Sequence, residues 1–410
     1  LQSNTETLSR SIGAPLKLHK VLVRDLGKPR SVSLPNHLLT LDVKQILDDP
    51  AIQIVVELIG GENPASEYIK EALEHGKHLV TANKEVMAKE GHELMTLADS
   101  QRLNLLFEGA VGGGIPIIGP LMTGLLADRI FSIHAIINGT TNFILSRMSE
   151  EGMHADEALR LAQKLGYAEA DPSDDIEGTD AAYKLAILAT LAFRSKIQPH
   201  DVFCEGITRL DAKDFKYARE LGWAIKLLAI AKRAENNIEV RVHPALIPEA
   251  HLFAKVRDVY NAAEMEGNLL GRTVFYGLGA GRDPTTSAIL GDLVEIGRGI
   301  IADRAPAKMA RLEEELVFKA MSDLETKYYL RLNVSDRVGV LAQITRVLGD
   351  LSISIASIIQ KDSDPQTQTA EIVITTHPAR EASIQESLIL LDQLEVVAEV
   401  NSLIRIEELP

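Results

Sequence analysis

An acidic loop followed by a helix holds the side chains in this chain that are best placed to transfer a proton. Residues 166–178 are rich in carboxylates, and Thr179, a favourable N-cap, predicts the start of a helix. Asp180 and Lys184 are four residues apart and therefore share one face of that helix. Because the apolar run 185–191 follows, we expect the Lys184 ammonium group at the edge of a buried helix, where it can donate a proton.

The competing interpretation is an ordinary surface ion pair, which is the usual meaning of an isolated Asp and Lys at this spacing. The apolar sequence after Lys184 and the nearby acids favour the proton-donor interpretation. Cys204, the single cysteine, lies in an apolar stretch and is expected to be a buried structural thiol rather than a nucleophile. One cysteine excludes a disulfide framework and a thiolate zinc site.

The elements before residue 108 alternate between strand and helix, which is typical of a doubly wound, Rossmann-like α/β domain. The β-branched run 52–59 predicts a parallel strand buried on both faces. The expected strands are 17–25, 52–59, 78–81 and 104–107, and the expected helices are 64–75 and a second one that ends near Leu97.

From Gly109 the pattern changes to that of an α+β domain, predicted over residues 109–283. The expected strands are 130–137, 239–243 and 272–278, and the expected helices are 142–149, 155–165, 179–194 and 214–233, the last with Trp223 in its core. A helix over 284–301 is expected to pack back on the first domain, residues 1–108.

A charged connector, 302–326, is expected to be helical from Lys308 to Glu325. After it the predicted elements follow a βαββαβ order, which indicates a ferredoxin-like module over residues 327–408.

Composition excludes several classes of protein. The net charge of −15 argues against a nucleic-acid partner, which would need clustered cations. No apolar run reaches the ~18 residues that a membrane span needs. Together with the single cysteine, these features predict a protein of the cytoplasm.

Five segments resemble homoserine dehydrogenases in order along residues 15–300. The most specific contains Gly166, Tyr167, Glu169, Asp171, Pro172, Asp175, Gly178, Asp180 and Lys184. The others are 81–85 (TANKE), 107–116 (FEGAVGGGIP), 138–145 (NGTTNFIL) and 279–288 (GAGRDPTTSA).

The resemblance implies hydride transfer between a nicotinamide cofactor and aspartate 4-semialdehyde, giving homoserine for threonine, methionine and isoleucine biosynthesis. It implies that Lys84 and Lys184 flank the reacting carbonyl, with Lys184 as the proton donor and Asp180 orienting it. The roles of the two lysines could be exchanged. The implied substrate-binding residues are Glu169, Asp175, Asp180, Gly139, Thr140 and Tyr167.

The implied cofactor contacts are Lys84, Arg24, Gly60, Gly279 and Gly281. After the second strand Asp25 would favour NAD, whereas Arg24 and Lys28 tilt the expectation to NADP. A structural sodium ion is also implied, held by Glu108 and the carbonyls of Val111, Gly113 and Ile115.

Residues 333–344 (NVSDRVGVLAQI) resemble the strand-to-helix turn of ACT domains, with Val338 where a proline is usual. This implies an amino-acid effector, with threonine expected, bound at Asp336, Gly339 and Val340. The alternative is a purely structural dimerisation module. The family also implies a homodimer formed through residues 109–283, and the ACT modules are expected to pair as well, which would give a dimer of dimers.

One feature departs from the resemblance. A G-x-G-x-x-G loop is expected before Leu18, and none is present. We therefore expect either a fragment that lacks the first strand and phosphate loop or a divergent protein, and poor NAD(P)H binding by these residues alone. The rival functions are a non-catalytic amino-acid-binding regulator and a semialdehyde dehydrogenase with a cysteine nucleophile.

Overall fold

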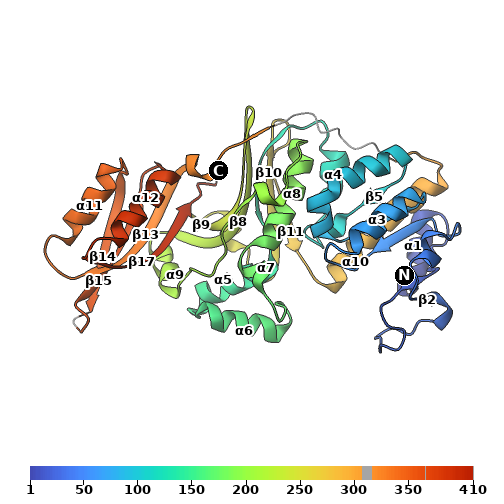
Figure 1. Ribbon diagram of the computed structural model, residues 1–410, viewed down its shortest axis with the longest axis horizontal. Helices are drawn as coiled ribbons and strands as arrows, with labels where there is room; N and C mark the ends of the chain where they lie inside the picture. The colour runs from blue at the N-terminus through green and yellow to red at the C-terminus, as the bar shows by residue number, and fades with distance from the viewer. Residues whose placement is uncertain (307–315, 365, 410) are drawn as a thin grey trace.

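The computed structural model describes residues 1–306, 316–364 and 366–409. The chain forms three parts in a row along its long axis, from the N-terminal helices and short strands, through a central sheet, to a C-terminal module (Figure 1). The prediction of an α/β part, an α+β part and a ferredoxin-like module is confirmed.

The N-terminal part contains two separate parallel sheets. Strands β3, β4 and β5 form one, and β1 pairs with β2 in the other. The element bounds are α1 Thr5–Ile12, β1 Val21–Leu22, β2 Leu39–Thr40, α2 Lys44–Leu47, β3 Ile54–Glu57, α3 Ala65–Glu74, β4 His78–Thr81, α4 Lys84–Gln101 and β5 Leu105–Leu106. The strand predicted over 17–25 is therefore much shorter than expected.

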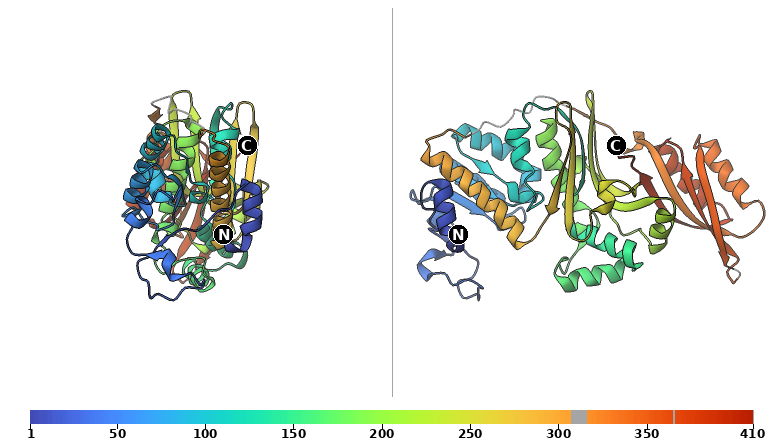
Figure 2. Two further views of the ribbon diagram at one scale, coloured as in Figure 1. Left: turned by 90° about the vertical axis from the view of Figure 1, so that its right-hand side faces the viewer. Right: turned by 180° about the vertical axis from the view of Figure 1, so that it is seen from behind.

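Strand β4 is buried on both faces. Leu79 belongs to the core that includes residues of α3 and α4, whereas Val80 packs with Leu293 and Ile296 of α10 (Arg282–Ile301). Successive side chains of a strand point to opposite faces, so the sheet needs a helix layer on each side. Helix α10 supplies the second layer together with α1, which lies beside it (Figure 2).

The central sheet has the order β11-β10-β6-β8-β9, and helices α5 and α8 pack against it. Its elements are β6 Ile130–Ile136, α5 Gly139–Glu151, α6 Ala155–Leu165, α7 Ser173–Ile176, α8 Thr179–Phe193, β7 Phe203–Cys204, α9 Ala212–Glu220, β8 Trp223–Ala234, β9 Asn237–Pro248, β10 Tyr260–Gly267 and β11 Gly271–Leu278.

The helix predicted over 214–233 is wrong. Helix α9 ends at Glu220, Gly222 adopts a left-handed φ of 79°, and Trp223 begins strand β8. Residues 225–231 are buried without alternation, so the strand shows no period of two, and its apolar run could not be distinguished from a buried helix.

The C-terminal module confirms the predicted βαββαβ order, with a short extra strand, β16, before the second helix. Its elements are β13 Glu325–Ser335, α11 Val340–Asp350, β14 Ile355–Asp364, β15 Thr369–Thr376, β16 Ala379–Arg380, α12 Glu381–Asp392 and β17 Val397–Ile406. Strand β17 also pairs in parallel with β9 at Arg405↔Ala245, which was not predicted. One continuous sheet therefore joins the module to the central part.

The connector differs from its prediction where it is described. Residues 307–315, which include most of the predicted helix, lie outside the described residues. Residues 316–325 are not helical as predicted, because β12 (Val317–Phe318) pairs with β9 and a 3-10 turn follows at Met321–Asp323. Within the described ranges, no helix combines the length and apolar character that crossing a membrane requires.

Candidate active site

Helix α8 presents Asp180 and Lys184 toward the same point, as their spacing predicts. Its N-cap is Gly178, with φ +87°, and not Thr179 as expected; Thr179 is the first helical residue. Lys184 Nζ donates to Asp180 Oδ2 at 2.7 Å and to the carbonyl oxygen of Ile137 at 3.0 Å. The Lys184 side chain is only 10% exposed, so the ion pair is not an ordinary surface pair.

The Asp180 carboxylate is shared by two lysines from different parts of the chain. Lys84 is the first residue of α4, whose N-cap is Asn83, and its ammonium group contacts Asp180 Oδ1. Burial alone would raise the pKa of Asp180, but the ammonium groups of Lys184 and Lys84 outweigh it and lower this pKa to about 2. Burial opposes the charge of Lys84, yet Asp180 raises its pKa overall, with help from Asp175 and Asp174. The site therefore holds a carboxylate between two ammonium groups.

Asn138 links the acidic loop to this cluster. Its Nδ2 donates to Asp175 Oδ1 at 2.6 Å and to Asp180 Oδ2 at 2.8 Å, while its Oδ1 accepts from Thr141 N and so caps α5. Asn138 opens the 138–145 segment but was not among the predicted site residues. An asparagine directly before Gly139 at a helix start was the available signal.

The contacts of the other predicted substrate residues do not involve Asp180. Thr140 Oγ1 donates to the carbonyl oxygen of Tyr167 at 2.7 Å, and the Tyr167 ring meets Phe143 edge-on. Gly139 passes so close to Val259 that a Cβ would lie 3.0 Å from its carbonyl oxygen. Glu169 is exposed, and its carboxylate contacts no other predicted site residue in the described chain.

Two of the predicted cofactor glycines adopt a positive φ, and the third leaves no space for a side chain. Gly60 follows β3 with φ +75°, and Gly281 caps α10 with φ +122°. At Gly279 a Cβ would lie 1.8 Å from Asn261 Nδ2. Arg24 is exposed after β1, and no hydrogen bond or ion pair joins it to another described residue.

The Glu108 carboxylate accepts hydrogen bonds from three backbone N–H groups. Its Oε1 accepts from Ile117 N at 2.6 Å and Ile118 N at 2.9 Å, and its Oε2 accepts from Gly119 N at 2.6 Å. The carbonyl oxygens of the other predicted sodium ligands, Val111, Gly113 and Ile115, accept no hydrogen bond from the described residues.

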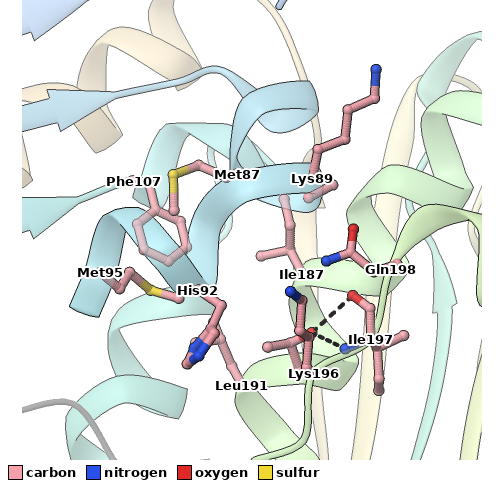
Figure 3. A pocket seen from close by; sticks show the side chains of 12 residues that line it. Met87, Lys89, His92, Met95, Phe107, Ile187, Leu191, Lys196, Ile197 and Gln198 are labelled. Atoms are coloured by element: carbon pink, nitrogen blue, oxygen red, sulfur yellow. Dashed lines mark hydrogen bonds between the residues drawn. The ribbon is translucent and has the colours of Figure 1, made fainter. Parts of the chain in front are cut away.

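A small cavity between α4 and α8 does not belong to this cluster. It holds about 20 Å³, room for roughly one water molecule, and its walls include Met87, Met95 and Phe107 (Figure 3). Neither Lys84 nor Lys184 lines it. We interpret it as a packing gap behind the helices that carry the lysines.

The predicted effector residues lie at the start of α11. Gly339 is the N-cap of this helix, with φ +91°, and no side chain of the described part of the chain caps it. Asp336 is exposed and donates its N–H to the carbonyl oxygen of Gln368 at 2.9 Å, whereas Val340 is buried. This helix start lies in the module at the opposite end of the molecule from α4 (Figure 1).

Cys204 is exposed rather than buried, which corrects the expectation. Its thiol donates to the carbonyl oxygen of Glu177 at 3.2 Å. Partial burial and the nearby Glu177 and Glu205 carboxylates raise the pKa of this thiol to about 11, which does not suit a nucleophile.

Comparison with known proteins gives one consistent family. Family profiles described as "Homoserine dehydrogenase, NAD binding domain", "Homoserine dehydrogenase" and "ACT domain" match residues 1–108, 116–294 and 328–395. The homoserine dehydrogenase of Synechocystis is 45% identical over 95% of this chain and 92% of its own length.

Solved structures agree with this result. The homoserine dehydrogenase of Thiobacillus denitrificans is 43% identical, with a TM-score of 0.90 over 100% of this chain and 94% of that one. A hyperthermophilic archaeal homoserine dehydrogenase in complex with NADPH is 32% identical, with a TM-score of 0.54 over 62% of this chain and 74% of that one.

Proposed function

The chain belongs to the homoserine dehydrogenase family, and we propose that Lys184 and Lys84 divide the chemical step of that reaction between them. The activity is that of an oxidoreductase which interconverts L-homoserine and L-aspartate 4-semialdehyde. The observation that supports the division is the single buried carboxylate, Asp180, that both ammonium groups contact.

Lys184 is the proposed proton donor. Reduction of the aldehyde leaves negative charge on its oxygen, and an adjacent ammonium group both stabilises that charge and supplies the proton. The nicotinamide cofactor, when bound, supplies the hydride. Lys184 is held by Asp180 and by the carbonyl oxygen of Ile137, so its position is fixed before substrate arrives.

Lys84 is the proposed electrostatic partner of Lys184. Its side chain is 40% exposed, against 10% for Lys184, and it reaches Asp180 from the cofactor-binding part. Asp175, held by Asn138, and Glu169 are the proposed partners of the substrate ammonium group. Gly139, Thr140 and Tyr167 form the proposed wall of the substrate pocket.

Lysine-to-methionine variants test this division. We expect Lys184→Met to lower kcat by roughly 10²- to 10⁴-fold, the usual contribution of a general acid, with KM changed only a few-fold. Lys84→Met should raise KM and lower kcat less. The control is Lys196→Met, whose side chain is half exposed and pairs with Glu93. The reverse pattern would assign proton donation to Lys84, and small equal losses in both variants would contradict the site.

NADP is the proposed cofactor form. The residues present fit a nicotinamide dinucleotide, since Gly60 and Gly281 have no side chain and would let the backbone approach the cofactor closely. Arg24 is exposed and without a partner among the described residues, as a ligand for a 2′-phosphate should be. We expect NADPH to be preferred to NADH, and Arg24→Gln to lower that preference by about tenfold, as measured by kcat/KM for both cofactors.

A sodium ion at Glu108 is a further proposal. Three carbonyl oxygens that accept no hydrogen bond from the described residues suit a hard cation, although Glu108 already accepts three N–H groups. Added NaCl, compared with equal choline chloride, should raise Tm of the wild type and not of Glu108→Gln. Equal shifts for both proteins would exclude this sodium site.

Three further features are proposed from the family alone: threonine as the effector of the ACT domain, a homodimer, which paired ACT modules could extend to a dimer of dimers, and a cytoplasmic location. Calorimetric titration with threonine and light scattering test the first two. No heat from threonine, or a monomer mass, would contradict the corresponding proposal.

A further inference from the structure

A cavity lies beside α5 and outside the proposed active site. It has a volume of about 190 Å³ and is bounded by α5, α9, the start of β8 and the 3-10 turn at Leu252–Lys255. Its charged lining residues are Glu150, Arg219, Lys226, Glu249, Lys255 and Arg257. None of the residues proposed for the reaction lines it.

Lys226 is the buried cation of this cavity. The residue is 5% exposed, and its Nζ donates to Asn142 Oδ1 at 3.0 Å and to the carbonyl oxygen of Val256 at 2.5 Å. No carboxylate of the described chain forms an ion pair with it. A buried ammonium group without a counter-ion is strongly disfavoured, and burial accordingly lowers the pKa of Lys226 to about 8.

The carboxylates around the cavity already pair with other cations. Glu150 pairs with Arg257 at 3.0 Å, and Glu249 lies 4.0 Å from Lys255. Arg219, at the rim, donates to the carbonyl oxygen of Ser149 and has no ion pair within the described ranges. Two cations therefore face this cavity without a matching negative charge.

We propose that this cavity binds a small anion of the carboxylate or phosphate class, with Lys226 and Arg219 as its cationic partners. The anion supplies the missing negative charge and fills a polar space that is large enough for a small molecule.

The same lysine also holds in place the turn that carries the proposed substrate residues Gly139 and Thr140. The Lys226 ammonium group fixes Asn142, and Asn142 Nδ2 donates to the carbonyl oxygens of Val256, Asp258 and Tyr260. The intervening Val259 is the residue that touches Gly139. An anion in the cavity keeps Lys226 charged and therefore strengthens this set of hydrogen bonds at the start of α5.

The charge of Lys226 depends on the groups that face it. Glu150 on α5 and Asp258 on the following loop favour its charged form, while Arg257 disfavours it. A bound anion adds to the first effect and binds best while Lys226 carries its charge, so the stabilisation by the anion should be largest below pH 8 and should decline as the pH rises above it.

Binding is measured without substrate, by thermal shift and calorimetric titration. The probes are inorganic phosphate and acetate at constant ionic strength. We expect a saturable rise in Tm with at least one of them. Arg219→Gln and Lys226→Met should weaken that binding at least tenfold, whereas Lys216→Met, at an exposed position on the same helix α9, should not change it.

Two outcomes overturn the proposal: no saturable binding by the wild type, or binding that both cavity variants retain. Phosphate that binds at the proposed cofactor site would still bind to both variants, and this result would count against the cavity. If Lys226→Met does not fold, Arg219→Gln decides alone, because Arg219 is exposed at the rim. Through the turn at Gly139 the anion should also change KM for homoserine, and this expectation rests on the proposed function. KM is measured separately, so an unchanged KM leaves the binding result intact.

Discussion

Lys84 and Asp180 form a direct ion pair although 96 residues separate them in the sequence. Lys84 starts α4 beside the parallel sheet of the N-terminal part, and Asp180 lies in the first turn of α8 beside the central sheet. The two parts therefore meet at the proposed catalytic charges.

Replacing Asp180 with asparagine should damage both catalysis and stability. The change leaves two ammonium groups side by side without the carboxylate that separates them, and unpairing a buried charge costs about 3–5 kcal/mol. We expect kcat/KM for homoserine to fall at least 100-fold. Asp174→Asn is the control, since Asp174 is exposed in the same loop and contacts neither lysine directly. Similar losses in both variants would show that general loop charge, not the shared carboxylate, matters.

The Asp180 cluster should also weaken in acid. The pKa of Asp180 is lowered from 3.8 to about 2 in the folded chain, which corresponds to roughly 2 kcal/mol of stability. This contribution is complete above the unfolded value near 3.8 and disappears as the pH falls through about 2. The difference in Tm between the wild type and Asp180→Asn should therefore be constant from pH 7 to 5 and shrink below pH 4. A difference that stays unchanged at pH 3 would contradict the assigned pKa.

The sequence predicted the spacing within one element better than contacts between elements. Asp180 and Lys184 could be placed together because a helix fixes residues four apart on one face. The approach of Lys84 came only from family resemblance, since no local pattern encodes a contact over 96 residues. Trp223 was misassigned because a strand buried on both faces has no period to detect. The β9–β17 pairing was missed because edge pairing depends on how two finished sheets dock.

Gly279 should tolerate no side chain. A Cβ would lie 1.8 Å from Asn261 Nδ2, and overfilling a packed site typically destabilises by about 1–3 kcal/mol. We expect Gly279→Ala to lower Tm and raise KM for the cofactor. Asn261→Ala should largely restore both in the double variant, because the Asn261 amide is buried without a hydrogen-bond partner in the described chain.

Gly291→Ala is the matched control for this prediction. Gly291 lies inside α10, and a Cβ there meets no atom of the described residues within 4 Å, so alanine should stabilise by roughly 0.5–1 kcal/mol. If Asn261→Ala fails to rescue Gly279→Ala, the glycine is required for another reason, such as direct contact with the cofactor.

Arg405 and Glu205 connect the ACT module to the acidic loop. Arg405 Nη1 donates to Glu205 Oε2 at 2.8 Å, and the segment after Glu205 packs directly on the loop, with Ile207 N donating to the carbonyl oxygen of Ile176 at 2.8 Å. A Cβ at Gly206 would lie 2.2 Å from that same oxygen. The contacts therefore run without a gap from strand β17 to the residues that start α8.

Glu205→Ala should reduce the response to the ACT ligand while leaving basal activity within about twofold. Arg405 keeps its two hydrogen bonds to Glu381, at 2.9 and 2.6 Å, so the module itself should remain folded. Assays of kcat and KM over a threonine series, with Arg346→Ala as an exposed control on α11, measure the effect. Coupling between distant sites requires a physical link that responds to ligand at one end. A full threonine response in Glu205→Ala would show that the signal travels through another contact, of which the β9–β17 backbone pairing is the nearest alternative.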